Sequence, residues 1–313
     1  MLGHYFKVIF PLNCKVAIRL FSTSRILRDP LDGQVALVTG ASRGIDIKHV
    51  GGNATPIYCD HSKPEEIQKL FAQIEQETHG TLDILVNNAF SGGQSMFSNA
   101  GKKFFECDPL FWDDVNNVGL RNNYICAVYA ARMMAKKKRG LIVNISAAGG
   151  IQYVFNVPYG VGKAAIDRMA ADMALELKPF GITVVSLWPG TVQTEVSKIM
   201  LQKDVLHKAL GLSKELCEKL VANGETPEFV GKSIAALASD PKVLKKTGKI
   251  HFTADLAKEY KFTDINGKLP PHMRSVSSAL EFFGWPKLAG LVPSFIKVPK
   301  PAMHFASYKF YKF

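Results

Sequence analysis

The stretch VALVTGASRGIDIKHVGGNATPIYCD (Val35–Asp60) decides the fold of this chain. It begins with a short apolar strand that runs into a glycine-rich turn, and this turn should open a helix. Gly40 lets the strand turn tightly, and Gly44 lets the backbone approach a pyrophosphate at the helix N-terminus. The turn therefore predicts a dinucleotide-binding unit. Such a unit needs a helix, a strand and a connection, yet only residues 45–53 are available to build them.

Composition bounds the class of protein. The 313 residues are 47% hydrophobic, which is enough for one large domain with a full core or for two small domains. The five cysteines (Cys14, Cys59, Cys107, Cys126 and Cys217) lie far apart and are odd in number. No pair has the C-x-x-C spacing of a metal site, and we predict no metal ligands. Reduced thiols in an intracellular protein explain them more simply than disulfides do.

The positive charge gathers at the two ends of the chain. The net charge is +12. Residues 1–28 and residues 282–313 each hold five basic residues and no acidic residue, so the 253 residues between them carry only +2. This distribution argues against a nucleic-acid groove and favours targeting or a negatively charged membrane surface. The run KKKR (Lys136–Arg139) predicts the solvated C-terminus of a helix, with a nuclear signal as the alternative.

The N-terminal segment PLNCKVAIRLFSTSR (residues 11–25) has the composition of a mitochondrial transit peptide, since it is basic, contains serine and lacks acids. On a helical wheel Lys15 and Arg19 form a basic stripe beside an apolar arc. We therefore expect an amphipathic helix and a mitochondrial location. A disordered extension without a targeting role is the alternative. The apolar stretches are too short and too often charged for a transmembrane helix.

Apolar strands alternate with helical patterns along the rest of the chain. We expect strands at residues 34–39, 54–59, 82–89, 141–146, 182–190 and 248–252. We expect helices at residues 63–80, 109–140, 159–181 and 225–241. Continuous apolar strands that alternate with helices predict a parallel sheet covered on both faces, which is an α/β fold.

Tyr159 and Lys163 are the strongest candidates for catalysis. In YGVGK they stand four residues apart, so both lie on one face of a helix. An ammonium near a phenol lowers the pKa of the tyrosine, which can then exchange a proton with a carbonyl or an alcohol. Tyr308 and Lys312 share this spacing but lie in the basic tail. Ser146 ends a strand 13 residues before Tyr159, and its hydroxyl could bond the same substrate oxygen.

Taken together, several motifs resemble those of the short-chain dehydrogenase/reductase superfamily. They are TGASRGI, the pair Cys59–Asp60, LDILVNNA, Ser146, YGVGK and WPGTVQTE, in the family's order and with compatible spacing. The resemblance covers residues from about 33 to the C-terminus. It implies a Rossmann-like, doubly wound parallel sheet. It also implies a homo-oligomer, because family members pair through the helices that hold Asn116 and Tyr159.

The resemblance implies a role for each matching residue. Tyr159 is the general acid and base, Lys163 is its partner and binds the nicotinamide ribose, Ser146 donates to the substrate oxygen, and Asn116 holds a water linked to Lys163. The positions that match cofactor-binding residues are Gly40, Ser42, Arg43, Gly44, Ile45, Asp60, Asn87, Asn88, Ala89, Pro189, Gly190, Val192 and Thr194. Arg43 is similar to the basic residue that meets the 2′-phosphate in other members, which favours NADP(H) over NAD(H).

The sequence departs from the family pattern at three places. Phe90 stands where most members have glycine, and Asp46 replaces the third glycine of the loop. The family also has a helix and a second strand after this loop, so about 30 residues, one βα unit, are missing. A skipped exon or an incorrectly assembled gene would produce this junction. The third family strand could then slide beside the first, or the edge could stay open.

The sequence thus predicts an NADP(H)-dependent carbonyl reductase or alcohol dehydrogenase that acts on hydrophobic ketones, such as steroid or xenobiotic carbonyls. Tyr153, Phe155, Val157 and Trp188 are apolar residues near the expected site. The alternative is a non-catalytic truncated isoform that binds partners or a membrane.

Three regions are expected. Residues 1–30 form a targeting or disordered leader, residues 31–268 the Rossmann-like domain, truncated after residue 45, and residues 269–313 a basic, apolar extension. The extension is expected to meet a membrane surface. The endoplasmic reticulum surface and the cytoplasm are therefore alternatives to the mitochondrial location.

Overall fold

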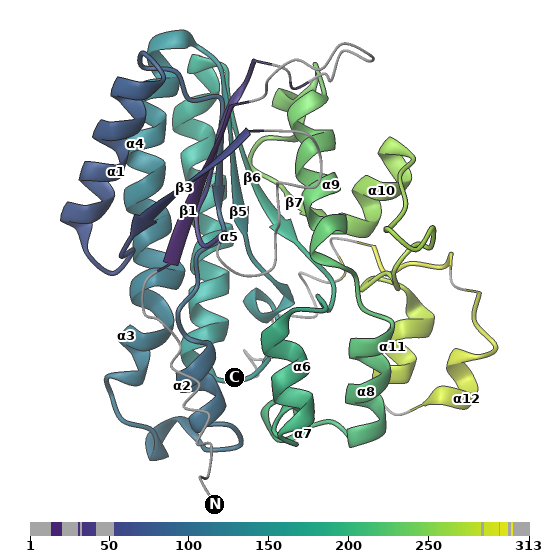
Figure 1. Cartoon of the computed structure of the whole chain (residues 1–313). Coiled ribbons are helices and arrows are strands. Elements are labelled where there is room, and N and C mark those ends of the chain that lie inside the picture. Colours follow the sequence, from purple (N-terminus) through teal and green to yellow (C-terminus); the bar gives the residue numbers. More distant parts are fainter. Residues whose placement is uncertain are drawn as a thin grey trace, which may run out of the picture.

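A seven-stranded sheet forms the centre of the molecule (Figure 1). The computed structural model describes residues 14–20, 31, 33–41, 53–282, 285–293, 295–299 and 302. The strands are β1 (Cys14–Leu20), β2 (Val35–Val38), β3 (Asn53–Cys59), β4 (Ile84–Asn87), β5 (Gly140–Ile145), β6 (Ile182–Trp188) and β7 (Ile250–Phe252). Their order across the sheet is β3-β1-β2-β4-β5-β6-β7. Five of them, β2 and β4 to β7, are parallel, as expected for a Rossmann-like fold.

The helices cover both faces of this sheet. They are α1 (Pro64–Glu77), α2 (Gly93–Ser98), α3 (Phe111–Asn116), α4 (Asn122–Lys137), α5 (Val157–Leu177), α6 (Glu195–Gln202), α7 (Leu206–Leu210), α8 (Lys214–Ala222), α9 (Pro227–Ser239), α10 (Thr253–Tyr260), α11 (Val276–Phe282) and α12 (Pro286–Ala289). One apolar cluster joins the sheet to α1, α4 and α5. A second cluster joins its other face to α9 and α10. Figure 1 shows these two layers on either side of the strands.

Burial on both faces explains why the strands are continuous apolar runs. Every residue of β2 and of β4 is buried, and so is every residue of β6. Such strands have no solvent side, so an alternating polar pattern is absent from them. The expected parallel sheet is therefore confirmed.

The N-terminal segment forms a strand where a helix was expected. β1 lies between β2 and β3 and runs antiparallel to both, with Leu20 opposite Val35 and Cys14 opposite Cys59. The helical expectation for this segment is wrong, because β2 and β3 offer two open edges whose hydrogen bonds a strand can satisfy. β1 occupies the place of the second strand in the 3-2-1-4-5-6 order of doubly wound sheets. The rest of the leader, residues 1–13 and 21–30, lies outside the described residues.

The position of β1 also shows that neither of the two arrangements expected after the loss of the βα unit is formed. β3 does not slide beside β2, and the edge of β2 is not left open. β3 becomes the outer strand, and Pro56 within it lacks a backbone donor, which suits an edge position. Most of the link between β2 and β3, residues 42–52, lies outside the described residues.

The helix expected at residues 109–140 is interrupted. α3 ends at Asn116, a π-helical turn spans Asn117–Arg121, and α4 continues from Asn122. Such turns often mark functional sites, because the widened helix re-aims a side chain. At the other end, α4 stops within KKKR and Lys138 has a left-handed backbone (φ 50°). The prediction that this basic run ends a helix is confirmed.

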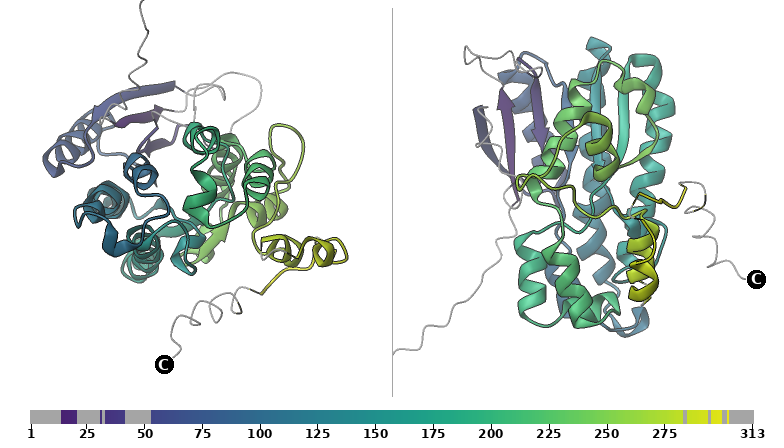
Figure 2. Two further views of the ribbon diagram at one scale, coloured as in Figure 1. Left: turned by 90° about the horizontal axis from the view of Figure 1, so that it is seen from below. Right: turned by 90° about the vertical axis from the view of Figure 1, so that its right-hand side faces the viewer.

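The C-terminal extension packs against α10. Asp255 of α10 forms a hydrogen bond with His272 at 2.7 Å and ion pairs with Arg274 at 2.8 Å and with Lys297 at 2.7 Å. α11 and α12 lie on the side of the molecule opposite α1 (Figures 1 and 2). Within the described part of the chain, no helix is both long and apolar enough to cross a bilayer.

Candidate active site

The carboxyl ends of the parallel strands meet at one edge of the sheet, where ligands of doubly wound folds bind. Gly40 follows β2, Ala89 follows β4, Ser146 follows β5, and Pro189 follows β6. Residues that are far apart in sequence are thereby brought to one edge. The catalytic candidates gather beside it, on α3, α5 and the end of β5.

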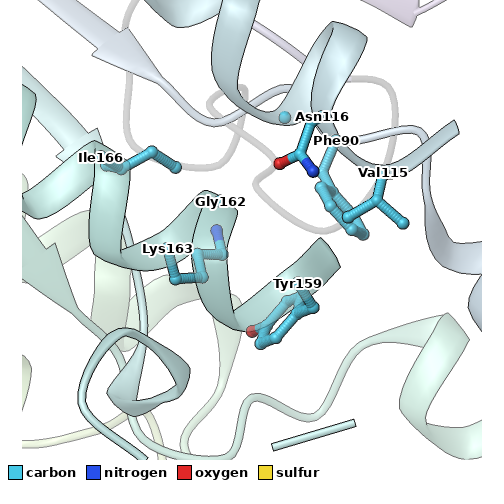
Figure 3. Close-up of a pocket in the computed structure, with 8 residues that line it drawn as sticks. Phe90, Val115, Asn116, Tyr159, Gly162, Lys163 and Ile166 are labelled. Carbon is cyan, nitrogen blue, oxygen red and sulfur yellow. The ribbon is translucent and has the colours of Figure 1, made fainter. Parts of the chain in front are cut away.

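Tyr159 and Lys163 lie one turn apart near the start of α5, as the sequence predicts. Asn156 caps this helix, because its side-chain oxygen accepts a hydrogen bond from the Tyr159 amide at 2.9 Å. Lys163 Nζ donates to the Ile145 carbonyl at 3.1 Å, and it lies 5.7 Å from the centre of the Tyr159 ring. Figure 3 shows both side chains in a small pocket that Phe90, Val115 and Asn116 line from the other side.

Burial governs the acidity of this pair. It raises the pKa of the Tyr159 phenol, and it lowers the pKa of Lys163 to about 8, against the opposing charge of Asp167. The sequence predicts instead that Lys163 lowers the pKa of Tyr159. In this structure the ammonium points to the Ile145 carbonyl, so desolvation is the dominant effect on the phenol.

Ser146 stands directly after β5 and is buried. Its amide donates to the Leu187 carbonyl at 2.9 Å, which fixes the end of β5 against β6. Its hydroxyl donates to the Lys163 carbonyl at 3.1 Å. The serine is therefore held next to the helix turn that carries Lys163.

Asn116 completes the group at the end of α3. Its side-chain nitrogen donates to the Pro158 carbonyl at 3.1 Å, which ties α3 to the start of α5. Its oxygen lies so close to Gly162 that a side chain at that position would collide with it. Asn116, Tyr159 and Lys163 thus line one pocket (Figure 3), and Ser146 bonds to the Lys163 carbonyl beside it.

Two phenylalanine rings hold the Tyr159 ring edge to face. The Phe90 ring lies 6.2 Å from it at 84°, and the Phe155 ring lies 5.1 Å from it at 88°. Phe155 has a positive φ of 63°, a strained backbone for a bulky residue and a feature that clusters at active sites. The Phe90 ring also lies 5.6 Å from Lys163 Nζ. Phe90, which stands where most family members have glycine, is therefore part of the pocket wall.

Gly40 and Ala89 pack closely where the cofactor is expected. Gly40 has a positive φ of 71°, and a Cβ atom there would lie 2.7 Å from Ala89 Cα. Thr39 organises this junction, because its hydroxyl accepts hydrogen bonds from the amides of Asn88 and Ala89 at 3.0 and 3.1 Å. Thr39 is not among the site residues predicted from the sequence, although a hydroxyl residue directly before the glycine turn is a recognisable signal.

Asn87 and Asp60, two further residues predicted to bind the cofactor, form hydrogen bonds within the protein. The Asn87 side chain is fully buried and donates to Asn144 at 2.8 Å and to the Asn123 carbonyl at 3.1 Å. Asp60 accepts hydrogen bonds from the amide and hydroxyl of Ser62 at 3.0 and 2.6 Å. Their roles in binding adenosine stay predictions.

The segment after β6 leads into the three short helices α6, α7 and α8, which we call the lid. Thr194 caps α6 by accepting from the Ser197 amide at 3.1 Å. Val192 forms a bridge with Glu225, the residue at which the lid returns to the body. Gly190 lies beside the Glu225 carboxylate. Phe155 packs on both the lid's apolar cluster and the cluster around Tyr159, and so connects them.

Glu225 is a buried acid at the base of this lid that sequence analysis did not single out. One carboxylate oxygen accepts from the Thr253 hydroxyl at 2.8 Å, and the other has no hydrogen-bond partner among the described residues. Burial raises the pKa of Glu225 to about 7, above its ordinary value of 4.5. The acid therefore keeps its proton at pH values where an exposed glutamate has lost it.

We expect Glu225→Gln to flatten the pH dependence of stability. Between pH 4.5 and 7 the folded chain retains a proton that the unfolded chain releases, so the free energy of unfolding falls as pH rises. Glutamine does not titrate, so this pH dependence disappears in the variant. Between pH 5 and pH 8, the free energy of unfolding of the variant should therefore rise by on the order of 2 kcal/mol relative to that of the wild-type protein. Denaturant unfolding at pH 5, 6, 7 and 8 measures the effect. The exposed Glu228→Gln is the control, and an unchanged slope in Glu225→Gln would contradict the assignment.

The described residues fit a nicotinamide dinucleotide well at one half of the site. Tyr159 and Lys163 line a small pocket there, and Gly40 keeps its close approach to Ala89. At the adenosine half, Cys14 at the start of β1 lies beside Cys59, where the family has the end of its second strand. Ser42, Arg43, Gly44 and Ile45 of the phosphate loop lie outside the described residues, as does Asp46.

Comparisons with known proteins place this geometry in a family. The family model for short chain dehydrogenase matches residues 46–204. The chain is 41% identical over 304 residues to the human dehydrogenase/reductase SDR family member 1, covering 87% of this chain and 96% of that protein. The mouse protein of the same name matches with the same identity and the same coverage. A solved structure, that of gox2181, has a TM-score of 0.50 at 21% identity and covers 62% of this chain and 72% of its own.

The human alignment also measures the gap. It spans 304 positions, whereas 87% of 313 residues is about 272, so roughly thirty positions fall opposite gaps in this chain. This deficit has the size of the βα unit that the sequence analysis finds missing. The family model, the two SDR relatives and the sheet together lead to one conclusion. The chain belongs to the short-chain dehydrogenase/reductase family, whose members are NAD(P)-dependent oxidoreductases.

Proposed function

We propose that the protein is an NADPH-dependent reductase of hydrophobic ketones, able in reverse to oxidise the corresponding alcohols. The observation that carries the proposal is the convergence of Asn116, Ser146, Tyr159 and Lys163 beside one pocket. When bound, the nicotinamide supplies the hydride. Tyr159 gives its phenolic proton to the carbonyl oxygen, and the Ser146 hydroxyl turns from the Lys163 carbonyl to bond the same oxygen. Lys163 stabilises the phenolate that the proton leaves behind.

The walls of the site support an apolar substrate. Phe90 and Phe155 flank Tyr159, and Phe155 extends this surface to the apolar lid cluster that includes Met200 and Leu206. The other apolar residues expected near the site do not line the pocket around Tyr159. Trp188 is buried against Phe252 in the core. Tyr153 and Val157 are exposed.

The test is oxidation of NADPH followed at 340 nm with a panel of steroid and aromatic ketones, against sugars and short aldehydes as polar controls. Faster turnover of the large apolar ketones supports the proposal, and a preference for sugars would refute it. Titration with NADPH and NADH tests the cofactor preference, which rests on Arg43. Equal affinity for the two cofactors would remove that part of the proposal.

We expect this chain to bind NADPH at least about tenfold more weakly than a version with the missing unit restored, a difference of about 1.4 kcal/mol. β1 runs antiparallel at the adenosine edge, so the strand in the second position ends at the opposite edge of the sheet and presents no ribose-binding residue there. The restored version carries the corresponding segment of the human relative after Ile45. Fluorescence titration of both proteins at one salt concentration measures the difference. Equal dissociation constants would show that β1 and the loop rebuild the site.

A membrane-binding role is the second candidate, and the C-terminal extension favours it. Trp285, Leu288, Leu291 and Phe295 expose 57%, 51%, 79% and 74% of their surface. The last 32 residues carry no acidic residue, which suits an anionic lipid surface. We propose that this face lies on such a surface. Sedimentation with vesicles that contain phosphatidylserine, and not with neutral vesicles, would support this role. The same binding by a Trp285→Ser/Leu291→Ser variant would refute it.

Location and assembly are also proposals. We propose a mitochondrial location, supported by the basic leader, of which residues 14–20 remain in the folded protein as β1, with the endoplasmic reticulum surface and the cytoplasm as alternatives. Residues 1–21 fused to a fluorescent protein test it, and a diffuse or reticular signal would refute it. We propose a homo-oligomer, supported by exposed Tyr124 on α4 and by Val161 and Leu175 on α5. Light scattering after gel filtration measures its mass, and a monomer at micromolar concentration would refute it.

A further inference from the structure

Asp167 lies one turn beyond Lys163 on α5 and is half-buried, with one carboxylate oxygen, Oδ2, shielded from solvent. One of its oxygens accepts two hydrogen bonds from β6, from the Ser186 hydroxyl at 2.5 Å and from the Trp188 indole at 2.9 Å. Ser186 and Trp188 are themselves buried. Asp167 therefore fastens the helix that carries the catalytic pair to the strand that leads into the lid.

The second oxygen of Asp167 faces the loop that carries Ser146. It has no hydrogen-bond partner among the described residues. A Cβ atom at Gly150, four residues after Ser146, would lie 2.7 Å from this oxygen. Burial raises the pKa of the Asp167 carboxyl, and the side chains of Ser186, Trp188 and Ser146 oppose this shift. A buried, unsatisfied carboxylate oxygen is costly, so its position next to Ser146 needs an explanation beyond packing.

Lys163 has few charged neighbours. From its own helix it meets Tyr159 and Asp167, from β5 the Ile145 carbonyl, and from the end of β4 the Phe90 ring. Among the described residues, Asp167 is the carboxylate whose charge acts on the Lys163 ammonium. A buried ammonium without a counter-charge tends to lose its proton.

We propose that Asp167 is a positioning residue for catalysis, whose carboxylate keeps Lys163 charged and holds the Ser146 loop and the Lys163 turn in register against β6. The proposal rests on the reductase function proposed above. It assigns the charge balance of the site to a residue that does not touch the substrate. Asp167 acts through Lys163 and Ser146.

The proposal has a defined pH signature. Reduction should slow as pH rises through about 8, because Lys163 then loses its proton. Without the charge of Asp167 the protonated lysine is less stable. The alkaline limb of the rate profile should therefore move to lower pH, by at least about half a unit.

The first experiment compares Asp167→Asn with Asp172→Asn. Asp172 lies on the same helix but pairs with Arg168 on the surface at 2.8 Å, so its variant is the matched control. We expect Asp167→Asn to keep its circular dichroism spectrum, to lose at least tenfold in kcat at pH 8, and to show the shifted alkaline limb. We expect Asp172→Asn to show neither change. A fall in melting temperature with an unchanged kcat and pH profile would make Asp167 merely structural and overturn the proposal.

The second experiment needs no activity and uses Trp188 as a reporter. The chain has three tryptophans, and Trp112 and Trp285 are exposed. A Trp112→Phe/Trp285→Phe protein therefore reports the indole that donates to Asp167. We expect its emission to titrate with the carboxylate, to stop titrating in Asp167→Asn, and to titrate at higher pH in Lys163→Met. An unchanged midpoint in Lys163→Met would show that the two charges are not coupled and would overturn the proposal. If no ketone is reduced but this coupling is found, the proposed substrate class fails while the charge pair stands.

Discussion

Replacing Tyr159 by phenylalanine should lower the rate of carbonyl reduction at least about a hundredfold, the usual contribution of a general acid. The variant loses only the phenolic oxygen. The ring contacts with Phe90 and Phe155 remain, so the fold and the pocket should persist. Steady-state kinetics with NADPH and the best ketone of the panel, on the version with the missing unit restored, measure the loss. Restoration separates this effect from weak cofactor binding.

Tyr308 and Lys312, which have the same spacing as Tyr159 and Lys163, provide the control for this prediction. Tyr308→Phe changes the second tyrosine that has a lysine four residues later, and it should leave turnover unchanged. The opposite result, with an active Tyr159→Phe and an inactive Tyr308→Phe, would show that the wrong pair was chosen. A melting temperature close to that of the wild-type protein should accompany the loss in Tyr159→Phe.

Deleting residues 1–20 should cause the chain to aggregate or to lose at least about 10 °C in melting temperature. β1 has four register pairs with β2 and seven with β3. At about 1 kcal/mol for each ladder hydrogen bond, their loss is comparable to the whole stability of a typical domain, about 5 to 15 kcal/mol. β3 pairs only with β1 among the described strands, so it would lose its place in the sheet.

Two further variants make this deletion interpretable. Deletion of residues 1–13 removes the chain that precedes β1, including Lys7, but keeps β1, and this protein should stay soluble. Ile18→Pro keeps the length but removes a backbone donor from a strand that is paired on both sides, and it should resemble the full deletion. A soluble, monodisperse deletion of residues 1–20 with an unchanged melting temperature would contradict the role of β1. That outcome would favour the other structure, in which β3 pairs directly with β2.

The sequence predicts the parallel part of the fold well, because buried strands and their turns are local signals. The runs at β4, β5 and β6 are mostly apolar and are followed by residues of recognisable chemistry, such as Ser146 and Pro189. β1 was missed although its residues alternate, with Cys14, Val16, Ile18 and Leu20 separated by Lys15, Ala17 and Arg19. The basic composition of this segment favoured the prediction of an amphipathic targeting helix over the strand that the period of two indicates. The strand also depends on open edges far along the chain, which no local pattern reveals.

The residues of the site also fall into those that the sequence predicts and those that it does not. Tyr159, Lys163 and Ser146 can be found from spacing, because one helix and one strand end place them. Glu225 and Asp167 cannot, since a carboxylate in a helical or turn pattern normally predicts a solvated face. Only the packing of β6, β7 and the lid shows that Glu225 is buried and that the Oδ2 atom of Asp167 is shielded from solvent. The π-helical turn after Asn116 was also hidden, because the apolar spacing of residues 109–140 fits a continuous helix.

The antiparallel insertion of β1 has a consequence for the order in which the chain folds. β1, β2 and β3 all lie within the first 59 residues, so this corner of the sheet closes through local contacts. In the usual doubly wound arrangement the same corner waits for a helical crossover before its second and third strands can pair. Local pairing has a low contact order and forms quickly. On the ribosome, the outer corner of this sheet can therefore assemble before the residues of the catalytic pocket have been synthesised.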